Sequence, residues 1–194
     1  MNSDVRRERI QHELIPRDDT LRMIGALNDL EARLAAAAER YQLLDDSGRV
    51  PAVPSYAELL QHAAGAQALS YDVVQMTVEF ARSLHSTNRV GSRVLAHLAT
   101  AATMSSQAVP NFAETAENAL SLPRSSGPPD RQYRDNRMVI DHATARAYLR
   151  RASESLRDAA KELDAHLDFH RFFPAQARQQ SPEPPPPRPS ARHR

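Results

Sequence analysis

The sequence contains no cysteine and no tryptophan, and only 5 of its 194 residues are glycine. Without cysteine there can be no disulfide, thiol nucleophile, iron–sulfur cluster or cysteine-ligated zinc. Isolated glycines leave few positions for hairpin turns or phosphate-cradling loops, and none of the glycine-containing nucleotide-binding or serine-nucleophile motifs occurs. The 25 basic and 24 acidic side chains give a net charge of +1, so no overall field attracts nucleic acid or an anionic membrane.

Long apolar segments are also missing. Residues 1–17 carry mixed charges and lack the apolar stretch of a secretory signal. The longest run without a charged residue lies between Arg93 and Glu114, and its 20 residues include His97, Gln107 and several Ser and Thr. Hydrocarbon would not accept this run, so we expect no membrane span and a cytoplasmic protein.

What is present is helical periodicity. Apolar residues recur at spacings of three and four after Asp18 and Asp19, which predicts a helix over 20–45. Ser55 and Glu58 form a capping box that opens a second helix. This second helix is expected to soften at 65–70 and to end before a turn at 88–91. Further helices are predicted over 92–108, from Pro110 to 122, and over 138–171, with a loop at 123–130.

These elements predict an all-α fold, an up-down helical bundle of about four to six helices with long first and last helices. The bundle domain is expected over 18–173, preceded by a flexible arm at 1–17. Six prolines fall between positions 182 and 189. The predicted organisation therefore ends in a disordered, Pro/Arg-rich tail over 174–194.

One sequence pair suggests catalysis. Arg137 and His142 form an R-x4-H pair at the start of the last predicted helix. The pair resembles the R-x4–6-H signature of HEPN ribonucleases, which are helical bundles, and the resemblance implies that both residues act on an RNA phosphate. The chain holds four such pairs, whereas about three are expected by chance from its composition. Ribonuclease activity is therefore a further alternative rather than the main hypothesis.

A second pair suggests a metal. His166 and His170 lie four residues apart on a predicted helix, a spacing at which two imidazoles can hold Zn²⁺ from one face. No H-E-x-x-H motif accompanies them. The alternative is structural, with both rings near a helix C-terminus where the dipole favours them. We expect neither a metal nor another cofactor.

Arginine is unevenly distributed. Residues 124–151 hold seven Arg and three Asp. Within this segment Arg131, Arg134 and Arg137 could contact a phosphate backbone. No recognition helix or RNA-binding signature accompanies them. Nucleic-acid binding through this cluster is therefore the second hypothesis.

The hypothesis that fits the sequence best is a non-catalytic helical interaction or regulatory module in the bacterial cytoplasm. It would bind a protein partner or itself, because a thin, alanine-rich core gains stability by burying surface against a second copy. The surfaces expected for self-association lie on the first and last helices, although the same residues could equally form an intramolecular core: Leu27, Leu34, Tyr41, Leu156, Leu163 and Leu167.

Overall fold

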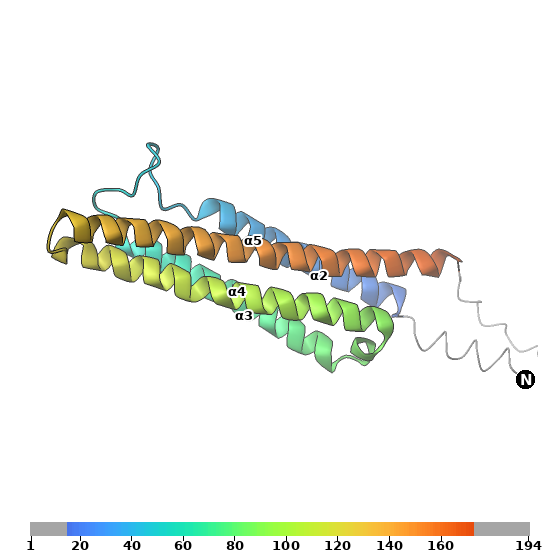
Figure 1. The fold of residues 1–194 in the computed structure, drawn as a ribbon. Coiled ribbons are helices and arrows are strands. Elements are labelled where there is room, and N and C mark those ends of the chain that lie inside the picture. The colour runs from blue at the N-terminus through green and yellow to red at the C-terminus, as the bar shows by residue number, and fades with distance from the viewer. Residues whose placement is uncertain (1–14, 173–194) are drawn as a thin grey trace, which may run out of the picture.

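The computed structural model describes residues 15–172, with side chains through residue 168 (Figure 1). This part of the chain folds into long helices joined by short connections and contains no strand, so the all-α prediction is confirmed. Residues 15–172 contain four long helices, at the lower end of the expected number. They are α2 (Arg17–Arg40), α3 (Tyr56–Arg82), α4 (Arg89–Ser121) and α5 (Pro128–Phe172), with the short 3₁₀ helices η1 (Leu84–Thr87) and η2 (Leu122–Arg124) before and after α4.

The bundle is built around α4 and α5, which pack along one another more extensively than any other pair. On this central pair, α2 packs against α5 and α3 packs against α4, whereas α2 and α3 barely touch. The main core runs between the helices and includes Leu27, Leu34, Leu98, Leu149 and Leu156, each almost completely buried. The bundle is therefore well packed on three of its sides and less so where α2 faces α3.

Two predicted interruptions are wrong. The soft point at 65–70 is continuous helix in α3, and the break at Pro110 lies inside α4. A proline inside a helix removes one hydrogen bond and costs about 3 kcal/mol. Buried residues nevertheless continue on both sides of Pro110 at the same spacing, from Ser105 through Ala108 to Phe112. Burial of this stripe against α3 and α5 favours one continuous helix.

The outer boundaries also differ from prediction. The first helix ends at Arg40 rather than 45, and the last begins at Pro128 rather than 138. Proline suits a first helical turn because its missing N–H would have no partner there. Asp130 adds a negative charge where the helix dipole favours one.

The described chain begins inside the bundle. Ile15, which the sequence placed in the arm 1–17, is fully buried, and Arg17 already belongs to α2. The backbone N–H of Ile15 donates to Nε2 of His166 on α5, at 3.1 Å. The rest of the expected arm and the Pro-rich tail at 174–194 lie outside the described residues. Among the described helices, none is long and apolar enough to cross a membrane.

The stripe expected to mediate self-association is core instead. Leu27, Leu34, Leu156 and Leu163 are completely buried, and Tyr41 is nearly so. Leu167 is half-buried. The alternative of an intramolecular core is confirmed for the buried members, because α2 and α5 pack these residues against each other and against the central helices. A contact with a second copy must therefore use residues other than these five buried ones.

Candidate functional site

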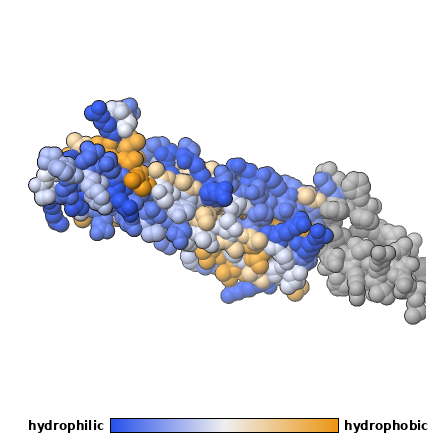
Figure 2. Space-filling view, in the orientation of Figure 1, coloured by the Kyte–Doolittle hydropathy of each residue, from blue (hydrophilic) through white to orange (hydrophobic). Residues whose placement is uncertain are grey.

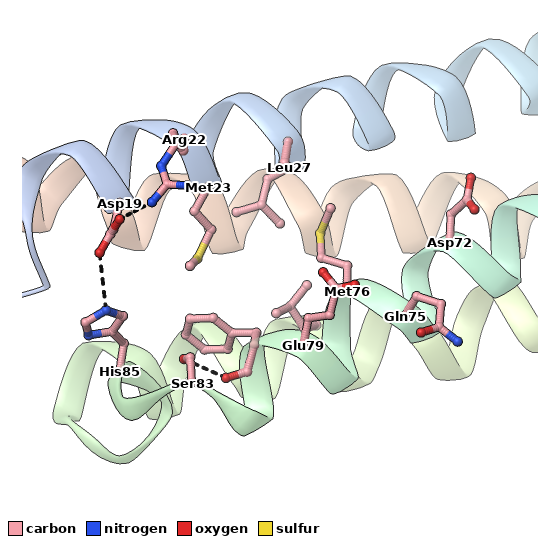
Figure 3. A pocket seen from close by; sticks show the side chains of 13 residues that line it. Asp19, Arg22, Met23, Leu27, Asp72, Gln75, Met76, Glu79, Ser83 and His85 are labelled. Atoms are coloured by element: carbon pink, nitrogen blue, oxygen red, sulfur yellow. Dashed lines mark hydrogen bonds and ion pairs between the residues drawn. The ribbon is translucent and has the colours of Figure 1, made fainter.

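A groove lies between α2 and α3, where the two helices fail to pack (Figure 3). Its volume is about 580 Å³, within the range of small-molecule sites. The first turns of α2 form one wall and the last turns of α3 form the other, with η1 at one end. The groove is lined by Asp19, Arg22, Met23, Ala26, Leu27, Asp72, Gln75, Met76, Glu79, Phe80, Ser83, His85 and Leu98.

The groove has an apolar interior and a charged rim. Met23 and Met76 lie half-buried on its two walls, and both pack against the core beneath. The interior is completed by Leu27, Phe80 and Leu98, all buried. Thioether side chains are flexible and polarisable, so such an interior adapts to ligands of different shape.

Two polar side-chain contacts cross the groove, one near each end. At the η1 end, Nε2 of His85 lies 3.6 Å from Oδ2 of Asp19, which also pairs with Arg22 (Figure 3). At the other end, the Arg33 guanidinium of α2 lies 2.6 Å from Oδ2 of Asp72 on α3. These two contacts therefore close the apolar part of the groove at its two ends.

A second surface runs along α3 and α4. These helices are aligned by a 3.0 Å contact between the hydroxyls of Ser70 and Ser106, and by Thr77, whose hydroxyl donates to the Leu98 carbonyl at 3.4 Å. The uncharged face consists of residues that point outward from the two helices, exposed except for half-buried Val78: Leu60, Ala64, Gln67, Tyr71, Val74 and Val78 on α3, and Ala99, Thr103, Ser106, Pro110 and Ala113 on α4.

The spacing of the uncharged face is regular. Its α3 residues alternate intervals of four and three, the periodicity of a coiled-coil seam. The buried stripe of α3 follows a different line, through Leu59, Ala66 and Val73, so this helix has apolar residues on two sides. Figure 2 shows an apolar patch where α3 approaches η1, whereas hydrophilic residues cover much of α5.

The α2/α5 side carries the opposite character. Its surface is tied together by ion pairs between the two helices: Arg150 with Glu39 at 2.9 Å, Arg146 with Glu39 at 3.8 Å, and Arg157 with Glu31. The side chain of Arg146 also donates from Nε to the Ala38 carbonyl at 2.6 Å. The α2/α5 side of the bundle thus carries charges that are paired between its two helices, whereas the residues of the uncharged face carry none.

A cluster of aromatic and imidazole rings lies inside the bundle near the C-terminal end of α2. Tyr41 stacks on His62 at 4.5 Å between ring centroids, and Phe112 packs edge-on against both. Nε2 of His142 lies 3.4 Å from Nδ1 of His62, so one ring donates a hydrogen bond to the other. Sequence periodicity placed His142 beside an apolar stripe but gave no sign of its partner, which lies 80 positions earlier on α3.

Burial shifts both imidazoles towards the neutral form. Desolvation, with smaller contributions from His62 and Arg146, lowers the pKa of His142 to about 4. Desolvation and the charge of Arg40 also lower the pKa of His62, although Glu58 opposes them. Two neutral rings can share the observed hydrogen bond without placing a charge in the core.

The residues of the R-x4-H pair do not converge. His142 is buried against His62 and Phe112, whereas half-exposed Arg137 pairs with Glu114 at 3.2 Å and with Asp141 at 3.0 Å. Asp141 is itself buried, and desolvation raises its pKa against the opposing effect of Arg137. The structure therefore forms no shared pocket in which a phosphate would meet both Arg137 and His142.

The possible metal pair is divided in a similar way. His166 is buried, and its Nε2 accepts the Ile15 hydrogen bond. The side chain of His170 lies outside the described part of the structure. Among the side chains that are described, no group of three or more His, Asp or Glu could hold a metal ion.

The arginine cluster is engaged within the chain. Arg131 donates to the Ala52 carbonyl at 2.8 Å, and Arg134 pairs with Asp130 at 3.3 Å. Arg137 is held by the two carboxylates described above. A nucleic-acid phosphate would have to compete with each of these partners.

Comparison with known proteins identifies no relative of the chain: no family model, curated protein or solved structure matches it. Function is therefore inferred from the groove and the uncharged face alone. Neither surface is apparent from the sequence, although the uncharged run between Arg93 and Glu114 contains the α4 residues of the uncharged face.

Proposed function

We propose that the protein is a non-catalytic helical interaction module that self-associates through the uncharged face. The observation that carries this proposal is the exposed three–four stripe on α3, from Leu60 through Tyr71 to Val78, beside an uncharged strip of α4. On α3 the only Asp, Glu, Lys or Arg between Glu58 and Glu79 is Asp72. A regular uncharged stripe at this spacing, with Gln67 as its one amide, favours packing against another helix.

A second copy suits this face better than a charged partner. A charged side chain buried against the face would lose water without finding an opposite charge, which is costly. The same face on a second copy brings only uncharged side chains. Two copies related by a twofold axis would place each face against its equivalent, the usual arrangement of homodimers.

The extent of the face sets the expected strength of association. Residues 60–78 of α3 rise about 27 Å, and two adjacent helices present a width of about 20 Å. Each copy therefore offers about 500 Å², or about 1,000 Å² in total, which is the lower limit for a specific interface. We expect a dimer whose population depends on protein concentration in the micromolar range.

The two alternatives find less support. A ribonuclease would need Arg137 and His142 at one exposed phosphate site, but His142 is buried among aromatic rings. Nucleic-acid binding through Arg131, Arg134 and Arg137 would require breaking contacts with Ala52, with the nearby carboxylates, or with both. We therefore do not adopt either one.

Size-exclusion chromatography with light scattering tests the proposal across a range of protein concentrations. The test variant is Tyr71→Lys, and its matched control is Tyr133→Lys on α5, because the two tyrosines are 61% and 68% exposed. We expect Tyr71→Lys to be monomeric at concentrations where the wild type and Tyr133→Lys are dimeric. A wild type that is monomeric at every concentration would refute self-association, and equal dimerisation of both variants would refute the assigned face.

A further inference from the structure

The groove between α2 and α3 has features of a ligand site that self-association does not use. Its lining residues and the uncharged face share no member. We propose that the groove binds an amphipathic cation, a molecule with an extended apolar body and an ammonium or amine head.

The apolar body is specified by the interior of the groove. Met23 and Met76 face the space from opposite walls (Figure 3), and the buried residues Leu27, Phe80 and Leu98 complete its lining. Ligand sites are mostly apolar with a few polar groups that fix orientation, and a volume of about 580 Å³ falls within their usual range. The thioethers allow chains of different thickness to be accommodated.

The positive head is specified by the rim. Three lining carboxylates, those of Asp19, Asp72 and Glu79, stand against a single lining guanidinium, that of Arg22. Asp19 and Asp72 already have partners. Glu79 is exposed and forms no ion pair with any side chain that the structure describes. A cationic head at the rim would give Glu79 the partner of opposite charge that Asp19 and Asp72 already have.

The bounded length of the groove favours a compact ligand over a peptide helix. A helix lying along the groove would have to displace the Asp19–His85 contact at one end and the Arg33–Asp72 pair at the other. A single alkyl chain fits between these pairs and leaves both intact. Its body would lie on the methionines, and its head would reach the rim.

The probe for this proposal is decyltrimethylammonium below its micelle concentration, with decyl sulfate as the probe of opposite charge. Isothermal titration calorimetry and thermal unfolding should show that the cation binds the native protein, with a dissociation constant below about 1 mM and a raised melting temperature. Decyl sulfate should bind at least tenfold more weakly. Absence of cation binding, or equal binding of the two probes, would overturn the proposal.

Two variants locate the binding. Glu79→Lys reverses the charge at the rim, and Glu117→Lys makes the same change at an exposed position of α4 that does not line the groove. We expect at least a fivefold loss of affinity for the cation in Glu79→Lys and no change in Glu117→Lys. Met76→Gln should weaken both probes, because it places an amide on the apolar wall. Equal affinity of the two charge-reversal variants would place the binding elsewhere and refute the site.

Discussion

The buried His62–His142 pair makes the stability of the bundle depend on pH. In the folded protein the pKa of His142 is lowered to about 4, from an ordinary value of 6.5. The unfolded chain therefore takes up a proton as the pH falls through 6.5, whereas the folded chain resists protonation until about 4. Acidification in this window favours the unfolded state, because the unfolded state binds more protons.

The size of the effect follows from the pKa difference. The free energy of unfolding should fall by up to about 3 kcal/mol between pH 7 and pH 4 through His142 alone. The lowered pKa of His62 acts in the same direction. A protonated ring at position 142 would face His62 and Arg146 across a buried contact, with no acidic group among the causes of its shift.

Urea unfolding followed by circular dichroism at several pH values measures this dependence. His142→Phe removes the titrating ring while keeping an aromatic side chain beside Phe112, and His142→Gln keeps a hydrogen-bonding group beside His62. Both variants should lose less stability than the wild type between pH 7 and pH 4. Carboxylates titrate in all three proteins, so the difference between them reports the histidine. Equal losses in all three would refute the reasoning.

Two further predictions concern stability. Gly25 has open space where a Cβ would stand, so Gly25→Ala should raise the free energy of unfolding by about 0.5–1 kcal/mol. In Gly91→Ala the new methyl group would overlap the backbone carbonyl of His85, so the free energy of unfolding should fall by about 3 kcal/mol or more. The melting temperature should rise in Gly25→Ala and fall in Gly91→Ala. A shift in the same direction in both variants would contradict the difference in available space at the two glycines. His166→Ala should cost about 1–2 kcal/mol, because it removes the ring nitrogen that accepts from Ile15, and a Zn²⁺-dependent stabilisation lost in this variant would instead indicate a metal ligand.

The long helices could be predicted because the spacing of apolar residues that marks each of them lies within that helix alone. Leu27 and Leu34 on α2, and Leu156 and Leu163 on α5, are spaced along one side of a helix, and all four are buried. The continuity of α4 was not predictable, because Pro110 is unfavourable locally and only contacts with α3 and α5 compensate for it. Local patterns therefore gave the class of fold and missed connections that depend on neighbouring helices.

The candidate sites were less predictable for the same reason. The groove exists because α2 and α3, although consecutive, barely pack together, and no spacing within either helix encodes that separation. Gly65 was interpreted as a weak point in its helix, but a side chain there would overlap the hydroxyl of Tyr41. That contact joins α2 to α3, so the reason for this glycine is visible only in three dimensions.

The order of helix packing along the chain has a consequence for how the bundle is completed. The main packing partner of α2 is not α3, the next helix, but α5, so that Arg150 and Arg157 pair with Glu39 and Glu31 more than 100 positions away. Closing so long a loop is entropically costly, whereas α4 and α5 are joined by a short connection. During synthesis α2 emerges early and must wait for nearly all of the described chain before it can dock. Among the helices that the structure describes, the one made first is therefore the one whose burial is completed last.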